Sequence, residues 1–311
     1  MEACYSQDKF NATTCDATST VIVTIQAFTG MWINAFIVSV LGIAWVKKKS
    51  FNSNEKILLF LGCCRFWYFC NTWVYFFLSM FYPWCLYVYP IPQLFATIQS
   101  FLNASNVWVS ACLCVFCCIK IANFRHTFFF YLKVKIDRIV PWLLLGSVFL
   151  SLVMCILVYN ITEKMYYNNL NSTTLGNFWK SENGLIFFPF FFINGFGFAT
   201  AFTAVIFSAL LLLFSVYNHK HKMQTNSVKN LSMDAHIKAM KSVLSFFFTC
   251  SINFTCLILA LIYATKEENP MLFLISVFQD AFLAVHSLIL IFSNPKLEKT
   301  LLKTLRCVKC K

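Results

Sequence analysis

Polar side chains inside apolar stretches are the residues of this chain that could do chemistry. Three sets stand out: Gln99, Asn103, Asn106 and Ser110; Ser242, Ser245, Thr249 and Asn253; Ser276, Asp280 and Ser287. Within each set the spacing is three or four residues or a multiple of a helical turn, so its members share one face of a helix. Amides and hydroxyls on such a face can hydrogen-bond another helix or orient a small ligand. Both interpretations stay open.

Depth separates these two interpretations. For the members of the three sets that would lie in the inner half of a membrane, we favour hydrogen bonds between helices, because polar groups in hydrocarbon need partners. The candidates for a ligand pocket open to the outside are Gln99, Asn103, Asn253, Ser276 and Asp280. With many phenylalanines nearby, that pocket would be apolar with a few orienting polar groups.

Two charges, Arg65 and Asp280, lie within apolar stretches, where a charge is costly and is usually paired or functional. Both are expected near mid-membrane, so pairing between them is one alternative. The other is a lock between helices, in which Arg65 hydrogen-bonds Asn34 or groups of the last apolar stretch, 270–293, such as Ser287.

No nucleophile–base constellation or metal-ligating cluster stands out in the sequence, so neither an enzyme nor a cofactor or metal is expected. Most of the 15 cysteines lie in apolar stretches and are interpreted as small packing residues. A Cys4–Cys15 disulfide stays open. Cys307 and Cys310 are interpreted as reduced or lipidated cysteines beside a membrane.

Composition identifies the class of protein. The 311 residues are 59% hydrophobic and 12% charged, whereas a soluble domain carries about 25% charged residues. A net charge of +13 is typical of nucleic-acid binding only when a soluble basic face carries it. The sequence therefore predicts a membrane protein and excludes nucleic acid as a partner.

The apolar stretches predict an all-α bundle of seven transmembrane helices. They lie near 21–46, 56–80, 92–119, 139–160, 186–216, 241–264 and 270–293. Residues 66–119 carry no charge, and as one helix they would be about 81 Å long, far more than the roughly 30 Å of a hydrocarbon core. Pro83, Pro90 and Pro92 supply the turn, because proline cannot continue a helix interior.

The loops predict the orientation. Lys and Arg number 4, 5, 5 and 6 in the segments 47–56, 120–138, 220–241 and 296–311, which makes 20, against 4 in the segments of the other side. This bias places the N-terminus outside, with 1–20 extracellular and 294–311 a cytoplasmic tail. The Asn-X-Ser/Thr sequons at Asn11 and Asn171 are then candidate glycosylation sites on the outer side.

Several blocks of residues resemble one family in register. They are GMWINAFI at 30–37, Arg65, CLCVF at 112–116 followed by KIANF at 120–124, LLLFS at 211–215, HIKAMKSV at 236–243, and HSLIL at 286–290 with Asn294 and Lys296. The chain is similar in these blocks to the type 2 (bitter) taste receptors, which are seven-helix G-protein-coupled receptors.

The resemblance implies a plasma-membrane receptor that binds small bitter agonists and activates a heterotrimeric G protein of the gustducin type. By the same resemblance, the residues facing the G protein are Lys120, Asn123, Phe124, Arg125, His219, His236 and Lys238. Anionic lipid is a further expected partner of this basic surface.

The chain departs from the family at four positions. Ala201-Phe202 stands where the family has proline before phenylalanine, Gln99 where it commonly has tryptophan, Asn253 where it has an aromatic residue, and Ser276 where it has an acidic or polar one. A pocket richer in amides than in relatives follows. The alternative function is a seven-helix small-molecule transporter, but the internal repeat that this would predict is not seen.

Overall fold

The structure is a computed structural model that describes residues 2–48, 52–121, 127–171, 195–215 and 270–309, with short pieces between 217 and 259. The side chains of 2–17 and 165–171 are among those outside this description. Its named elements are α1 (Glu2–Lys48), α2 (Ser53–Phe81), the 3-10 helix η1 (Pro83–Tyr87), α3 (Ile91–Ile121), α4 (Thr127–Asn171), α7 (Pro270–Ser293) and α8 (Pro295–Lys309). Gly195–Ser215 and Phe247–Cys256 are two further helical segments.

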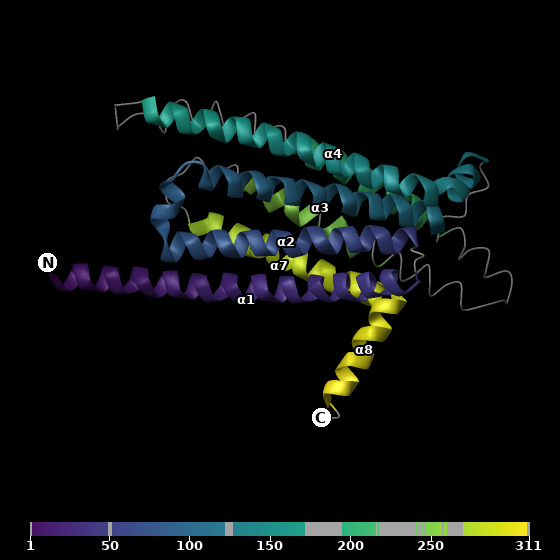
Figure 1. The fold of residues 1–311 in the computed structure, drawn as a ribbon, viewed down its shortest axis with the longest axis horizontal. Coiled ribbons are helices and arrows are strands. Elements are labelled where there is room, and N and C mark those ends of the chain that lie inside the picture. The colour runs from purple at the N-terminus through teal and green to yellow at the C-terminus, as the bar shows by residue number, and fades with distance from the viewer. Residues whose placement is uncertain are drawn as a thin grey trace.

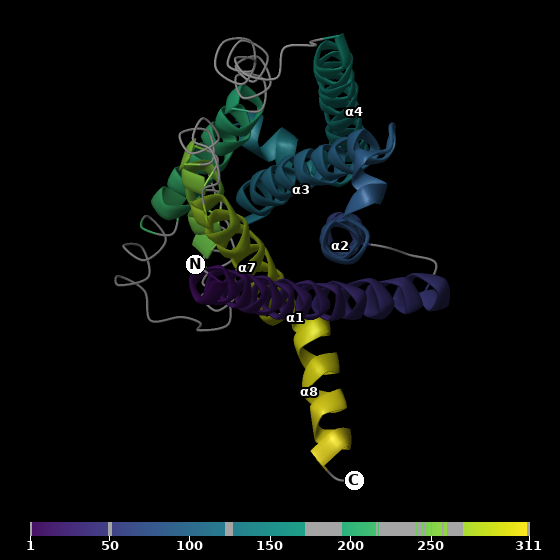
Figure 2. The ribbon, with the colours of Figure 1, turned by 90° about the vertical axis from the view of Figure 1, so that its left-hand side faces the viewer.

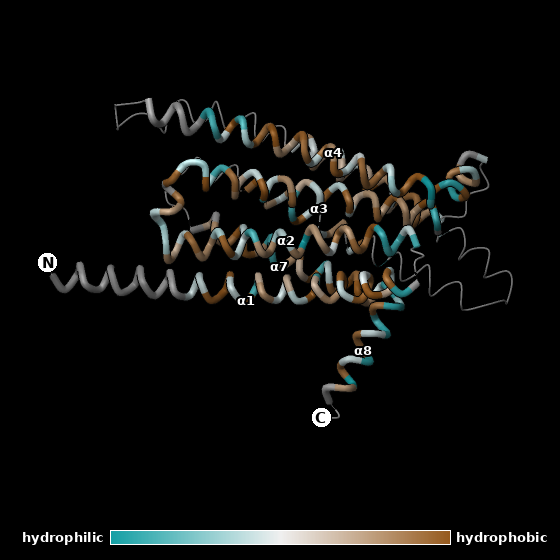
Figure 3. Tube along the Cα trace, in the orientation of Figure 1, coloured by the Kyte–Doolittle hydropathy of each residue, from teal (hydrophilic) through white to brown (hydrophobic). Residues whose placement is uncertain are grey.

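The predicted all-α membrane bundle is confirmed. Within the described residues, six helices are long and apolar enough to cross a membrane, and Phe247–Cys256 adds a shorter apolar helix. The large apolar side chains on their outer faces are exposed, among them Trp32 (77%), Val46 (74%) and Trp142 (73%). Figure 3 shows hydrophobic residues recurring along the coloured parts of the long helices, as expected of segments that cross a membrane.

Two helices are longer than the sequence predicted. α1 begins at Glu2, so the segment expected as an extracellular N-terminus is helical. α4 covers Thr127–Asn171 rather than 139–160, so Asn171 is the last residue of a helix. Hydropathy marks only the apolar part of a helix, whereas backbone hydrogen bonds continue through its polar ends. α7 has the predicted bounds.

Prolines turn the chain between α2 and α3, as predicted. α2 ends at Phe81, and the backbone N–H of Tyr82 donates to the carbonyl of Leu78 at 2.9 Å. Pro83 begins η1. Pro92 lies in the first turn of α3, where its missing N–H has no partner in the helix anyway.

α3 is the central helix of the bundle. In its span 72% of the most apolar window is buried, against 22–44% in the other five spans. α3 packs against α2 and α4, and α1 packs against α2 and α7 (Figures 1 and 2). Towards the end of the bundle where α8 starts, a core cluster joins these helices through buried residues that include Leu41, Leu61, Val109 and Leu290.

α8 was not predicted, because residues 294–311 were expected only as a tail. It leaves the bundle at a steep angle beside the end of α7 (Figure 1). Leu297, Leu301 and Leu305 recur every four residues and Lys296, Lys299 and Lys303 lie opposite them, so the helix is amphipathic. This spacing was the signal in the sequence from which α8 could have been predicted.

Candidate functional site

Arg65 is the centre of a buried polar network that joins four helices. Its Nε donates to Asn106 Oδ1 at 2.8 Å, and its Nη1 donates to Ser287 Oγ at 2.8 Å. Its Nη2 lies 2.7 Å from His286 Nδ1 and 3.4 Å from Ser110 Oγ. Because arginine can only donate, His286 accepts at Nδ1. The guanidinium of α2 is thereby bonded to α3 and α7.

α1 joins the network through Ser287. The Ser287 hydroxyl donates to Asn34 Oδ1 at 3.1 Å, with the carbonyl of Leu283 at 3.2 Å as its other acceptor. Asn34 Nδ2 donates in turn to the carbonyl of Gly30 at 2.8 Å. We call Asn34, Arg65, Asn106, Ser110, His286 and Ser287 the Arg65 network. None of its members is more than 3% exposed.

Glycine allows α1 and α2 to approach each other beside this network. A Cβ atom added to Gly30 would clash with the ring of Phe69, which is fully buried. Such a clash requires the ring or the helix to move. The position of Asn34, one turn along α1, therefore depends on a residue without a side chain.

Asp280 has a partner other than Arg65. The Tyr68 hydroxyl donates to Asp280 Oδ1 at 3.0 Å, so this pair also joins α2 to α7. Tyr68 lies three residues from Arg65 on α2, and Asp280 lies seven residues from Ser287 on α7. The two intramembrane charges thus contact different groups at different depths, and the predicted alternative of direct pairing is not what the structure shows.

Gln99 contacts α2 rather than an open space. Asn71 Nδ2 donates to Gln99 Oε1 at 2.7 Å, and Gln99 Nε2 donates to Thr72 Oγ1 at 2.9 Å. Together with Tyr68 and Asp280, these residues form a second polar group, which we call the Gln99 cluster. It lies between the Arg65 network and the end of the bundle that carries η1.

The α2 members of the Gln99 cluster were not predicted from the sequence. Arg65, Tyr68 and Thr72 are spaced i, i+3 and i+7, and this spacing alone places them on one helix face. The polar residues predicted as pocket residues came instead from α3, α7 and the stretch that contains Asn253. His286 likewise entered only as part of the family resemblance.

The other predicted pocket residues differ in their surroundings. Asn103 is half-buried and has no hydrogen-bond partner among the described residues. Asn253 is 6% exposed, and its Oδ1 has no partner within the part of the chain that the structure describes. Ser276 is exposed and its hydroxyl donates to the carbonyl of Phe273, in its own helix, at 2.8 Å.

The Ala201-Phe202 pair packs the Gly195–Ser215 helix against its neighbours. Ala201 is fully buried in a cluster with Val107 and Ala111 of α3. The ring of Phe202 stacks on Phe247, with ring centroids 5.6 Å apart. A small residue followed by a large aromatic one thus fills the space between three helices.

Few of the predicted G-protein-facing residues are described. Lys120 ends its span on α3, pairs with Asp137 of α4 at 3.5 Å and lies 5.0 Å from the ring centroid of Phe116. The rest of that predicted set lies outside the described residues: Asn123, Phe124, Arg125, His219, His236 and Lys238. The side chains of the sequon residues Asn11 and Asn171 also lie outside them.

Two surface hollows lie apart from the polar groups. One, of about 400 Å³, runs along α1 beside Gly42, and the other, of about 550 Å³, runs along the Gly195–Ser215 helix beside Phe207 and Phe214. Apolar side chains line most of both, although Ser39 and Lys47 also border the first. Among the described residues, no group of three or more His, Cys, Asp or Glu could hold a metal ion.

Comparison with known proteins gives a consistent result over nearly the whole chain. The family model described as taste receptor protein (TAS2R) matches residues 12–309. The chain is 34% identical over 296 residues to taste receptor type 2 member 60 of Pongo pygmaeus, which covers 89% of this chain and 88% of the relative. It is 29% identical over 286 residues to taste receptor type 2 member 9 of Homo sapiens, covering 90% and 91%. For taste receptor type 2 member 2 of Homo sapiens the values are 28% over 299 residues, covering 94% and 96%. The chain therefore belongs to the type 2 taste receptor family and is a bitter taste receptor, a multi-pass G-protein-coupled receptor of the plasma membrane and not an enzyme.

Proposed function

We propose that this receptor binds small bitter molecules in a pocket open to the outside and activates a gustducin-type heterotrimeric G protein from the opposite end. In this proposal the N-terminus is extracellular and α8 is cytoplasmic. The agonist contacts polar groups of α3, of the Phe247–Cys256 helix and of α7: Gln99, Asn103, Asn253, Ser276 and Asp280.

Unused hydrogen-bonding capacity is the observation that carries the ligand site. Asn103 has no partner in the described part of the chain, and the buried Asn253 Oδ1 has none either. A buried polar atom without a partner is costly. A small molecule with complementary donors and acceptors would remove that cost, and the surrounding aromatic rings would bury its apolar part.

The Arg65 network and the Gln99 cluster suggest how agonist binding changes the bundle. Tyr68 and Arg65 lie on one face of α2, and Asp280 and Ser287 lie on one face of α7. An agonist that competes for Gln99 or Asp280 weakens the contacts of α2 with α3 or α7 in the outer half. The Arg65 network joins the same helices deeper in the bundle. Such an agonist therefore shifts the population between arrangements of helices that differ at the inner face.

The basic segments at one end support the position of the G-protein site. Lys120 of α3, Lys56 of α2 and Lys296 of α8 belong to the four lysine- and arginine-rich segments counted above. The Ser53–Asp137 hydrogen bond joins the start of α2 to α4, and the Lys296–Glu55 pair joins it to α8, so these three lysines belong to segments that lie at the same end of the bundle. That end is the cytoplasmic one under the positive-inside rule.

The test compares Asn103→Ala and Asn253→Ala with the control Thr255→Ala in cells that express a promiscuous G protein. Thr255 is exposed and its hydroxyl donates to the carbonyl of Ser251, so its loss should leave the agonist site unchanged. Calcium release is measured over a panel of chemically diverse bitter compounds.

We expect each asparagine variant to lower the potency of hydrogen-bonding agonists by about five- to a hundred-and-fiftyfold, from the roughly 1–3 kcal/mol of an unsatisfied buried partner. Surface expression is measured alongside to exclude misfolding. If both variants reach the surface and keep every agonist within twofold of the wild type, this pocket is wrong.

A further inference from the structure

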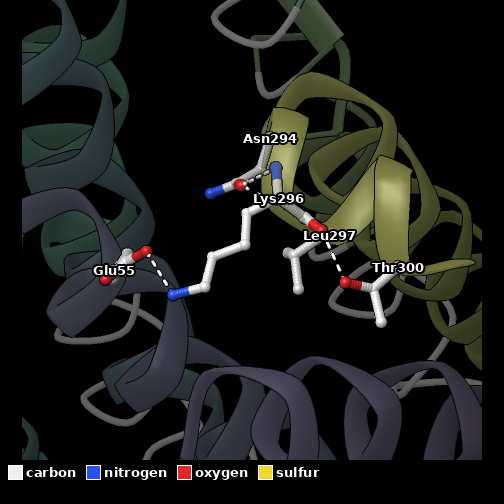
Figure 4. Close-up of polar contacts among 5 residues, drawn as sticks. All are labelled: Glu55, Asn294, Lys296, Leu297 and Thr300. Carbon is white, nitrogen blue, oxygen red and sulfur yellow. Dashed lines mark hydrogen bonds and ion pairs between the residues drawn. The ribbon is translucent and has the colours of Figure 1, made fainter. Parts of the chain in front are cut away.

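An ion pair joins α8 to the beginning of α2. Lys296 Nζ lies 2.7 Å from Glu55 Oε1, and the two side chains are only 34% and 18% exposed (Figure 4). Lys296 is the second residue of α8, and Glu55 is the third residue of α2. The contact therefore joins the first turns of two helices that are 241 residues apart in the sequence.

The first turn of α8 is held by other contacts as well. Asn294 Oδ1 accepts the backbone N–H groups of Lys296 at 3.0 Å and Leu297 at 3.4 Å, which caps the helix (Figure 4). The Leu297 side chain is fully buried in the core cluster at this end. The cap and Leu297 fix where α8 starts. The Lys296–Glu55 pair adds a contact to α2.

The first turn of α2 also contacts α4. Ser53 Oγ donates to the carbonyl of Asp137 at 3.4 Å, and the Asp137 side chain pairs with Lys120 of α3. The stretch Ser53–Glu55 is thus bonded to α4 on one side and to α8 on the other. Both neighbours border the inner face that the G protein would contact.

We propose that Glu55 and Lys296 are positioning residues for G-protein coupling. Their ion pair holds α8 against α2, and this arrangement keeps the border of the inner face in the geometry that the G protein accepts. The proposal rests on the proposed function, because it assumes that coupling takes place at this end. α8 carries five basic residues and one acidic residue. Glu55 is the acidic residue in the first turn of α2, and it gives Lys296 in the first turn of α8 a fixed partner.

The expected effect is modest, because the pair is only partly buried. Double-mutant cycles show that exposed ion pairs contribute little free energy. That free energy corresponds to about a two- to fivefold change in an equilibrium constant. We therefore expect Glu55→Lys and Lys296→Glu each to lower agonist-stimulated nucleotide exchange on purified G protein by at least twofold. Agonist binding affinity should stay unchanged, because the pair lies at the opposite end from the proposed pocket.

The deciding variant is the charge swap Glu55→Lys with Lys296→Glu. It restores the pair with its polarity reversed, so it should recover at least half of the exchange activity that the single variants lose. Lys299→Gln is the matched control. It removes a positive charge from the exposed face of the same helix and should behave like the wild type.

The outcomes separate the two proposals. Single variants that couple like the wild type, or a swap no better than the single variants, would overturn the positioning role. If the wild-type receptor does not stimulate exchange on any G protein, the proposed function fails. The pair itself is then judged by the melting temperature in detergent, which the single variants should lower and the swap should restore.

Discussion

Replacing Arg65 with alanine should impair the receptor whatever the agonist. The substitution removes a guanidinium that is 1% exposed and bonded to α3 and α7. It leaves Asn106 Oδ1 without its donor and separates Ser287 from α2. Because these contacts join helices rather than contact ligand, the loss should appear equally for agonists of different chemistry.

The structure sets the size of the effect. Three of the Arg65 hydrogen bonds measure 2.7–2.8 Å. Hydrogen bonds between transmembrane helices contribute about 0.6 kcal/mol on average and about 1.7 kcal/mol at most. Three such bonds amount to about 2–5 kcal/mol. This is a large part of the roughly 5–15 kcal/mol that stabilises an ordinary folded protein.

The assay has three measurements: surface level by an epitope on the N-terminus, melting temperature of purified receptor, and dose–response curves for at least two unrelated agonists. Arg65→Lys keeps the charge but cannot reproduce the forked donor geometry, so it should give an intermediate loss. Trp67→Phe is the control, since Trp67 belongs to the same helix but is 61% exposed at the surface of the bundle. Normal surface level, melting temperature and signalling in Arg65→Ala would refute a structural role.

Three further results are expected. Gly30→Ala should destabilise the purified receptor by about 1–3 kcal/mol because the new methyl group meets the Phe69 ring; Gly42→Ala, where a Cβ meets nothing within 4 Å, should leave the melting temperature equal or higher. Gln99→Trp removes two hydrogen bonds to α2 and adds bulk, so the set of active compounds in the calcium assay should change while surface level is retained. Asn171→Gln should increase gel mobility and reduce the further shift with glycosidase, and unchanged mobility would rule out a glycan at that residue.

The helices themselves could be predicted from the sequence because the signal is strong and local. The long apolar stretches and the prolines between α2 and α3 determine which residues cross the membrane and where the chain turns. Helix ends were predicted less well, as α1 and α4 show, because polar residues extend a helix without any hydropathy signal. α8 is amphipathic, and its periodicity was readable in the sequence.

The partners of the polar residues could not be predicted in the same way. Spacing shows that Gln99 and Asn103 share a face of α3, but it does not show which helix that face meets. The rotation and tilt of each helix decide this, and they follow from the packing of many apolar side chains together. Hence Gln99 is hydrogen-bonded to Asn71 and Thr72 of α2, and neither residue was predicted as its partner.

The described partners of Arg65 are neutral, and this bears on how the bundle can change. The described hydrogen bonds of the guanidinium go to an amide, hydroxyls and an imidazole on α3 and α7, while the carboxylate of Asp280 is bonded to Tyr68. Each of these bonds is weaker than a contact with a carboxylate would be, yet a buried charge cannot be left with few partners. A movement of α7 away from α2 must therefore exchange the bonds to Ser287 and His286 for another complete set. This requirement favours a few discrete arrangements over continuous deformation, and an agonist can shift the population between discrete arrangements with a few kcal/mol of differential binding.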